Sequence, residues 1–362
     1  ASCEMVTQLA HWFEYCKSIV YHVYRDTISK DQVKFLAGLM LHNFGCRAGM
    51  VPQESEWLAA DALYIFSGTD TFSGAYQAWK NSGEAAGIAS SVFALAHRNV
   101  QGFESEKDCH EKLNSVAEDG SIDSHVADCY AYFDTVENIL LPLAMQNAIE
   151  ENGKVVVGRP DSGDPAEQVL WLCKLAHKHG LSTVQTILKK EWRFGTSMKF
   201  IEGDGMSWEK MKEINEDLIL HGFPPFAWGL YGVGGGLRNE LARDNFSAKY
   251  ALCAIGKEFK PVCKFSETLE KTTLPGPFKL LRSKEALESM KTVVFPDEPG
   301  EDVMVDYFNG ADIWEPFKEG YNDDFLTIKQ RIQDQMETMP LTLSNMDNHN
   351  YPTSDKIKEV RI

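Results

Sequence analysis

The sequence predicts an α/β fold: an irregular TIM-like barrel followed by a smaller, mostly β second domain. The first observation is Val155-Val156-Val157, which is typical of a strand buried on both faces, as in a parallel sheet. The second is that a polar loop and then a helical pattern follow this strand. The third is that the same alternation of apolar run, loop and helix occurs six times before about residue 247 and then stops.

The unit around residues 155–180 is the clearest of the six. Its loop carries Arg159 and Asp161 between turn-forming residues. Asp164 and Pro165 supply an N-cap and a proline at the first helical position, and Gly180 ends the predicted helix. The charged side chains therefore follow the carboxyl end of a buried strand, where barrels and doubly wound sheets carry out their chemistry.

The remaining units extend this organisation along the chain. Residues 5–40 are expected to be helical with a break near Lys30-Asp31, and Ser207 is expected to cap a helix over 208–219. The number of repeats favours a closed barrel over an open sheet. The six apolar runs predicted as strands are 60–66, 89–94, 122–127, 155–157, 198–202 and 226–231.

Beyond residue 247 the pattern changes to short strands joined by turns, predicted at 249–255, 261–265 and 278–282. A last amphipathic helix is expected over 323–337. We therefore predict a barrel domain at 1–250, a β-rich segment at 251–322, and a C-terminal helix and tail at 323–362.

Composition excludes several classes of partner. The 362 residues carry a formal net charge of −17, which argues against a nucleic-acid surface but not against a small anionic ligand. No apolar run approaches the length of a membrane span, so no membrane partner is expected. Early charged residues argue against a signal peptide, and the eight cysteines show no CxxC spacing. We therefore expect a reduced, cytoplasmic protein.

Two glycine-rich loops indicate a phosphate ligand. Gly203-Asp204-Gly205 and Gly232–Gly236 both follow predicted strands, where backbone N–H groups can approach an anion without interference from a Cβ atom. The alternative is a tight turn or a place of close strand–helix packing. The spacing does not fit a P-loop.

Asp161 and Asp204 are expected to point into the cavity at the carboxyl face of the barrel, where they would accept hydrogen bonds from the ribose hydroxyls of a sugar phosphate. The alternative for a single loop aspartate is an Asx-turn or a helix cap. His97 also follows a predicted strand, although a lone histidine is more often a structural hydrogen-bonding residue than a catalytic one.

Six collinear motifs between about residues 36 and 250 resemble those of the nicotinamide phosphoribosyltransferases, within the nicotinate/nicotinamide phosphoribosyltransferase family. Two downstream segments, 264–267 and 271–276, look more like the related nicotinate phosphoribosyltransferases. The six motifs are Asn43–Arg47, Gly68–Thr71, Ala96-His97, Arg159–Gly163, Gly203–Gly205 and Gly232–Leu237.

The resemblance implies the barrel of type II phosphoribosyltransferases and a reaction of NAD salvage. Nicotinamide and 5-phosphoribosyl pyrophosphate (PRPP) would give nicotinamide mononucleotide and pyrophosphate. Positive charge would build on the ribose as pyrophosphate departs, so catalysis would consist of positioning both substrates and neutralising the leaving group with the help of Mg²⁺.

The resemblance also implies roles for the residues that contact the base. Phe44 and Arg159 would sandwich the pyridine ring, and Asp70 would accept a hydrogen bond from the carboxamide of nicotinamide. His97, implied as a catalytic residue together with Asp161 and Asp204, resembles the histidine that the family phosphorylates with ATP, which makes ATP an expected activator.

The phosphate-bearing part of the substrate would contact a second set. Gly203, Asp204, Gly234 and Gly235 would hold the ribose phosphate. Phosphate or diphosphate would be bound by Arg47, Arg243, Ser247 and Lys249.

The chain departs from the family at two places. Ala96 stands where the family has an acidic residue before its histidine, which removes an expected orienting partner of the imidazole. A further ~100–150 residues, about a domain, precede this region in the family and contribute to its second domain and dimer interface. We therefore expect a homodimer, a second chain that supplies this segment, or both.

Three other readings stay open at this point. In the nicotinate branch of the family, Asp70 would face the substrate's own carboxylate and repel it. A different barrel enzyme acting on a sugar phosphate would have the same composition and periodicity. A catalytically silent subunit, which binds a nucleotide or a partner chain, would explain the absent segment but not the retained His97, Arg159 and Asp161.

Overall fold

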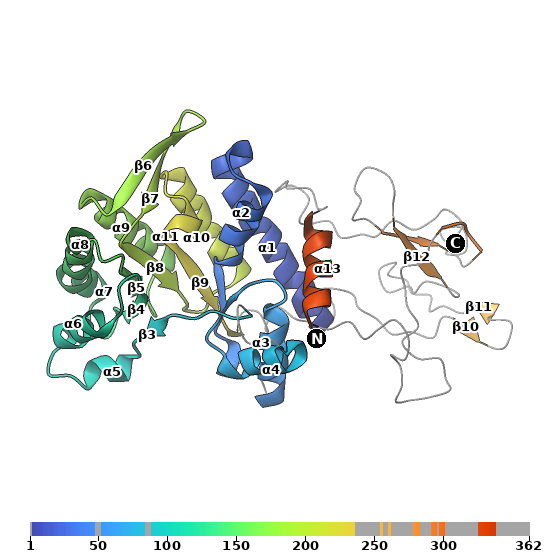
Figure 1. The fold of residues 1–362 in the computed structure, drawn as a ribbon, viewed down its shortest axis with the longest axis horizontal. Coiled ribbons are helices and arrows are strands. Elements are labelled where there is room, and N and C mark those ends of the chain that lie inside the picture. The colour runs from blue at the N-terminus through green and yellow to red at the C-terminus, as the bar shows by residue number, and fades with distance from the viewer. Residues whose placement is uncertain are drawn as a thin grey trace. The chain divides into compact units, whose positions relative to one another are not determined.

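The structure is a computed structural model that describes residues 2–47, 52–83 and 88–235, and, further along, 254–255, 260–261, 278–282, 291–294, 297–300 and 325–337. The chain divides into two compact units, Ala1–Ala242 and Arg243–Ile362. Figure 1 shows the first unit as strands surrounded by helices, coloured from blue to yellow.

A seven-stranded, wholly parallel sheet forms the centre of the first unit, in the order β2-β1-β9-β8-β5-β4-β3. Read from β3, the strands follow one another in chain order and continue from β9 to β1 and β2, and each connection between parallel neighbours crosses over the sheet, as parallel pairing requires. The strands are β1 (Leu41–Asn43), β2 (Gly68–Thr69), β3 (Phe93–Ala94), β4 (Ile122–Val126), β5 (Val155–Arg159), β8 (Met198–Glu202) and β9 (Gly229–Val233).

The two edges of this sheet are joined by a single segment. Ser90 forms a parallel bridge with Gly68 of β2, and the Thr69 N–H donates to the Ser90 carbonyl over 3.0 Å. Three residues later, Phe93 pairs with Asp123 of β4 at the opposite edge. The sheet is therefore curled into an irregular barrel, which confirms the predicted fold class.

Helices cover the strands on the outside. The predicted break in the first helical region is a 3-10 turn, η1 (Arg25–Thr27), between α1 (Ser2–Tyr24) and α2 (Lys30–Gly38), and Ser29 forms a capping box with Gln32. The other helical elements of this unit are η2 (Gly45–Arg47), α3 (Pro52–Ala62), α4 (Phe72–Ser82), α5 (His97–Gln101), α6 (Glu106–Val116), α7 (Tyr132–Thr135), η3 (Val136–Leu140), α8 (Leu141–Glu150), α9 (Pro165–Lys178), α10 (Trp208–Leu220) and α11 (Pro225–Trp228).

Local caps fix where the helices begin. Asp164 accepts a hydrogen bond from the Glu167 N–H over 3.0 Å at the start of α9, and Ser207 accepts one from the Lys210 N–H at the start of α10. The chain leaves α9 through Gly180, whose φ of +79° favours glycine. Both predicted helices are confirmed.

Two predicted strands need correction, and one strand was not predicted. The run 60–66 is the end of α3 and a turn, because its alanines favour helix and their methyl groups pack inward; the strand begins only at Gly68. The run 226–231 begins in α11, and β9 starts at Gly229. The sequence analysis missed β1, which has only three residues, all buried, and so shows no alternation.

The analysis also missed an antiparallel hairpin of β6 (Ser182–Ile187) and β7 (Lys190–Gly195), which extends from the barrel in Figure 1. Its two-residue turn uses Leu188 and Lys189 with φ of +52° and +66°. Such a turn usually contains Asn or Gly, so the sequence carries no hairpin signal here.

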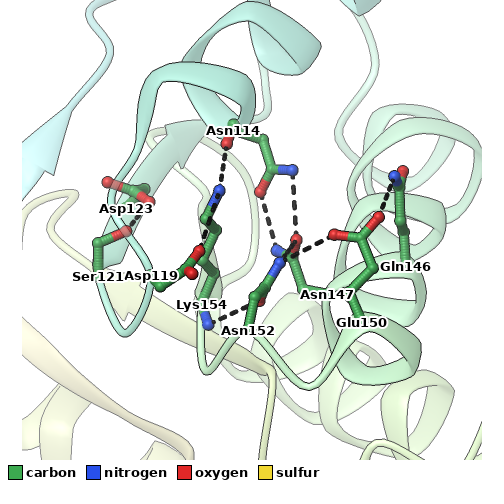
Figure 2. Close-up of polar contacts among 9 residues, drawn as sticks. All are labelled: Asn114, Asp119, Ser121, Asp123, Gln146, Asn147, Glu150, Asn152 and Lys154. Carbon is green, nitrogen blue, oxygen red and sulfur yellow. Dashed lines mark hydrogen bonds and ion pairs between the residues drawn. The ribbon is translucent and has the colours of Figure 1, made fainter.

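A polar network joins the helices at the amino ends of β4 and β5 (Figure 2). The amide of Asn147 donates to Asn114 Oδ1 over 2.8 Å, and the amide of Asn114 donates back over 3.3 Å. Asn152 and Lys154, which precede β5, add bonds to Asn147 Oδ1 and to the Asn114 carbonyl. This network ties α6 to α8 at the end of the strands opposite to the predicted site.

The second unit contains two antiparallel pairs and a helix among its described residues. The pairs are β10 (Ala254–Ile255) with β11 (Lys260–Pro261), and β12 (Lys279–Arg282) with β13 (Lys291–Val294). The helix α13 (Phe325–Glu337) agrees with the predicted 323–337. The rest of the predicted strands 249–255 and 261–265 lies outside the described residues. In the described part of the chain, no helix is long and apolar enough to cross a membrane.

Candidate active site

The predicted site residues that the structure describes lie at the carboxyl ends of strands or in the loops that follow them, and Arg159 is the last residue of β5. Phe44 follows β1, Asp70 follows β2, Asp161 follows β5, Asp204 follows β8 and Gly234 follows β9. Since the strands are parallel, these positions share the carboxyl edge of the barrel, where ligands of such folds bind. His97 lies at the same edge, two residues after Leu95, whose N–H bonds to β4.

His97 is held by a carboxylate that the sequence analysis did not single out. Its Nε2 atom lies 3.0 Å from Oδ1 of Asp128, whose side chain is only 8% exposed. The Ser162 hydroxyl donates to the other oxygen of Asp128 over 2.6 Å. Asp128 follows β4 as Asp161 follows β5, and that equivalence is the sequence signal that would have identified it.

Asp161 lies near the other nitrogen of the same ring. Its Oδ2 atom lies 3.8 Å from Nδ1 of His97, and both side chains are partly exposed. When Asp128 accepts the Nε2 proton, Nδ1 carries the lone pair and is the nitrogen available for nucleophilic or proton-transfer chemistry. His97 and Asp161, both predicted as catalytic residues, lie next to each other in the structure, and their catalytic role stays a prediction.

Arg159 belongs to the His97 side of the site. Its guanidinium donates to the carbonyl of Leu95 over 2.7 Å, two residues before His97. Its Nε atom is buried and, among the residues that the structure describes, has no hydrogen-bond partner. The structure therefore joins Arg159 to the histidine loop.

Phe44 instead packs against glycines. A Cβ atom at Gly232 would lie 2.0 Å from Cε2 of Phe44, and one at Gly203 would lie 3.0 Å from the same atom. A Cβ atom at Gly234 would be 3.1 Å from the Phe44 carbonyl oxygen. These glycines thus have a packing role, the alternative weighed for the glycine-rich loops, and the phosphate-binding role of Gly203, Gly234 and Gly235 stays a prediction.

Asp70 is anchored by a neighbour from the segment that closes the barrel. The Ser91 hydroxyl donates to Asp70 Oδ1, and the Asp70 N–H donates to the Asn43 carbonyl over 3.0 Å. Burial lowers the pKa of the nearby His42, an effect that the negative charge of Asp70 opposes. Asp70 is thereby held as a hydrogen-bond acceptor at the site edge. The sequence analysis did not find Ser91.

Glu202, the last residue of β8, is a second acid that the sequence analysis missed. It is 1% exposed, and its Oε1 atom accepts a hydrogen bond from the Asp204 N–H over 2.9 Å. Burial, opposed by that hydrogen bond and helped by the charges of Asp204 and Asp161, raises the pKa of Glu202 to about 7. A lone glutamate at the end of an apolar strand gave no sequence signal of its own.

Four of the predicted phosphate-binding residues cannot be placed as side chains. Arg243, Ser247 and Lys249 lie outside the described residues, and Arg47 is placed only as the last residue of η2. Within the described ranges, no group of three or more His, Cys, Asp or Glu side chains is arranged to hold a metal ion.

The curled parallel sheet and its polar carboxyl edge define an α/β barrel of the class that binds small ligands at the ends of its strands. The chain belongs to the nicotinate phosphoribosyltransferase (NAPRTase) family, whose model matches residues 39–296. That range contains every predicted site residue, and the family resemblance inferred from the motifs is confirmed.

Two curated relatives are similar to this chain. One is the nicotinamide phosphoribosyltransferase of Xanthomonas campestris pv. campestris (strain 8004), 29% identical over 242 residues, or 64% of this chain and 49% of the relative. The other is the nicotinamide phosphoribosyltransferase of Mycoplasma pneumoniae, 26% identical over 230 residues, or 60% of this chain and 48% of the relative. The chain spans about half the length of these relatives.

Two solved structures also resemble the chain. The nicotinate-nucleotide pyrophosphorylase from Pyrococcus furiosus has a TM-score of 0.47 at 12% identity, covering 91% of this chain and 70% of that one. A nicotinate phosphoribosyltransferase, described as putative, from Saccharomyces cerevisiae has a TM-score of 0.40 at 16% identity, covering 65% of this chain and 49% of that one.

Proposed function

We propose that this chain carries a phosphoribosyltransferase site that converts nicotinamide and PRPP into nicotinamide mononucleotide and pyrophosphate. The observation that carries the proposal is the placement of His97 between Asp128 and Asp161 at the carboxyl edge of the barrel. The family membership and the activity named for both curated relatives support it.

The geometry suits a reaction in which positive charge develops on a ribose. Asp161 and Asp204 are exposed carboxylates at the same edge, where they would hold the ribose hydroxyls and stabilise an oxocarbenium-like transition state. Arg159 and Phe44 would enclose the pyridine ring, which requires the Arg159 guanidinium to turn from the Leu95 carbonyl towards the ring when nicotinamide binds. Mg²⁺ carried by the diphosphate of PRPP would neutralise the leaving group.

We also propose a role for ATP through His97. With Nε2 bound to Asp128, Nδ1 would attack the γ-phosphorus of ATP, the bond from that phosphorus to the bridging oxygen would break, and ADP would leave. Asp128, on the loop after the neighbouring strand β4, would then orient the imidazole in place of the acidic residue that the family has at the position of Ala96. Incubation with labelled ATP should give an acid-labile phosphate that is absent from His97→Ala; a label retained by that variant would contradict the assignment.

Substrate choice separates the two branches of the family. Asp70, held by Ser91, can accept a carboxamide N–H but repels a carboxylate, so nicotinamide should be preferred over nicotinate. Asp70 is exposed in the structure, so its discrimination depends on the substrate burying it. A site whose hydrogen bond is buried by the bound substrate discriminates by several kcal/mol, on the order of 10⁴-fold, against an analogue that leaves its polar group unpaired.

The test is the ratio of kcat/KM for the two substrates in the wild type and in Asp70→Ser. We expect wild type to favour nicotinamide and Asp70→Ser to move the ratio towards nicotinate. Ser91→Ala, which keeps the carboxylate but frees it to move, should raise KM for nicotinamide and leave nicotinate unused. Equal use of both substrates by the wild type would contradict the role of Asp70.

The expected assembly, a homodimer or a complex with a second polypeptide, is part of this proposal, as is a cytoplasmic location. Free cysteines at the described positions, three of them buried, support a reducing compartment. Light scattering on the purified protein would decide the assembly. An active monomer without any partner chain would contradict this part of the proposal, whereas no turnover in any assembly would favour a silent binding subunit.

A further inference from the structure

Glu202 is a buried acid at the base of the proposed site, and no motif or proposed role accounts for it. It ends β8, directly before the turn Gly203-Asp204-Gly205, and is 1% exposed. A carboxyl group is seldom buried without a compensating partner, because desolvation penalises its charged form. The groups around Glu202 therefore indicate whether the fold accommodates its neutral or its charged carboxyl group.

One oxygen of Glu202 holds the turn that follows. Oε1 accepts the N–H of Asp204 over 2.9 Å, and Gly205 has a φ of +52°, so the chain turns sharply over the carboxyl group. From the other side, the Lys210 ammonium of α10 donates to the Asp204 carbonyl over 3.4 Å. A neutral carboxyl group can accept the Asp204 N–H as well as a charged one can, so this anchoring does not require ionisation.

The other oxygen has no hydrogen-bond partner, among the described residues, that would stabilise a negative charge. Oε2 is buried and has no hydrogen-bond partner in the described part of the chain, and the same is true of the Tyr132 hydroxyl on α7. Among the described residues, the backbone N–H groups of Asp204 and Gly203 favour the charged form of Glu202, but burial outweighs them. The side chains that interact with Glu202 there are Asp204 after β8, Asp161 after β5, Tyr132 and Tyr231 of β9. None of these supplies a positive charge, and both aspartates disfavour ionisation of Glu202.

Tyr231 is already occupied, because its hydroxyl donates to Asn215 over 2.6 Å. Burial, and then the negative charge of Glu202, raise the pKa of Tyr132, so that hydroxyl stays protonated. Burial likewise raises the pKa of Glu202 to about 7. Loss of its proton would place a third negative charge beside Asp161 and Asp204, where the proposed ligand is itself anionic.

We propose that Glu202 is a positioning residue for phosphoribosyl binding, which holds the Gly203–Asp204 turn as a neutral carboxyl group and weakens the binding of PRPP when it loses its proton. This inference rests on the proposed function. Binding of PRPP above neutral pH would then take up one proton from solvent at Glu202, and affinity would fall as the pH rises.

The test compares the wild type with Glu202→Gln and Glu202→Ala by calorimetric titration with PRPP and Mg²⁺. Between about pH 6 and about pH 8.5 the wild-type Kd should rise about tenfold beyond any change in Glu202→Gln, because glutamine keeps the acceptor and cannot ionise. Protonation of PRPP itself affects both proteins alike and cancels in the comparison. Glu202→Ala, which lacks the acceptor, should bind weakly at both pH values.

Equal pH dependence of Kd in the wild type and in Glu202→Gln would overturn the inference, and so would tight binding by Glu202→Ala at both pH values. Failure of the proposed function looks different, because then no variant binds PRPP at any pH. In that case the ligand part of the inference falls with it. Thermal unfolding of the wild type and of Glu202→Gln still tests whether Glu202 titrates in the folded protein. The wild type should lose stability relative to Glu202→Gln as the pH rises towards about 7.

Discussion

The Nε2 atom of His97 lies 3.0 Å from Oδ1 of Asp128, so the histidine that follows β3 is oriented by the acid that follows β4. The sequence analysis expected an acidic partner next to the histidine and found Ala96 there instead. The barrel brings the loops of adjacent parallel strands together, and an acid on the neighbouring loop can therefore take over the same task.

We expect Asp128→Asn to lower kcat about 10²-fold or more, because the amide cannot stabilise the charged imidazole as a carboxylate does. Asp134→Asn is a matched control, since Asp134 is an exposed acid of α7 that accepts a hydrogen bond from Asn138. Steady-state rates for both variants, with circular dichroism to verify folding, measure the effect. Equal rates for Asp128→Asn and the control would show that Asp128 is not needed.

Gly232→Ala should destabilise the protein by about 1–3 kcal/mol, because the new methyl group would overlap the Phe44 ring and force it to move. Phe44→Ala removes the obstruction, so the double variant should recover part of the stability lost by Gly232→Ala. Denaturant unfolding of the two single variants and the double variant forms a complete cycle. Purely additive losses would show that the two residues are not in contact.

Acid should destabilise the protein through a buried histidine pair. Nδ1 of His110 lies 3.0 Å from Nδ1 of His125, and burial lowers their pKa values from 6.5 to about 4 and about 3. The unfolded chain binds these protons more readily than the folded chain, so stability is present above pH 6.5 and is lost as the pH falls towards 4. The double variant His110→Gln with His125→Gln should show a flatter dependence of Tm on pH over this range; an unchanged slope would contradict the account.

Asn147→Ala should cost about 1–3 kcal/mol of stability, because Asn147 is buried and its loss leaves the half-buried amide of Asn114 and the amide of Asn152 without their shared acceptor. The network lies at the amino ends of the strands, so KM for nicotinamide should stay within about twofold of wild type. A twofold change in KM corresponds to a free energy well under the 1.4 kcal/mol of a tenfold change. Asn138→Ala, on an exposed helix face, is the control for stability. A large rise in KM would mean that the two ends of the barrel are coupled.

The sequence predicted the parts of the fold that depend on local rules. The caps at Asp164 and Ser207 and the end of α9 at Gly180 follow from side-chain and backbone preferences within a few residues, and they were found. The strand β1 and the turn at Leu188-Lys189 were missed because they depend on tertiary packing rather than on local pattern.

The same distinction holds for the site. Residues that follow strands in recognisable motifs, such as His97 and Asp161, were predicted as site residues from the sequence, and the structure places these two side chains next to each other. Asp128, Ser91 and Glu202 were not identified, because each acts through a partner far away in the sequence: Asp128 through His97, Ser91 through Asp70, and Glu202 through the surroundings that bury it. Sequence alone also could not show that the Arg159 guanidinium is bonded to Leu95 rather than directed towards Phe44.

The most direct test of the central claim is to measure nicotinamide mononucleotide and pyrophosphate formed from nicotinamide, PRPP and Mg²⁺. The wild type should release the two products in equal amounts, and Asp161→Asn should reduce the rate about 10²-fold or more while Asn147→Ala stays active. Any chain that copurifies with the protein is left bound to it during the measurement. Absence of both products from folded wild-type protein, or an equal rate for Asp161→Asn, would contradict the account.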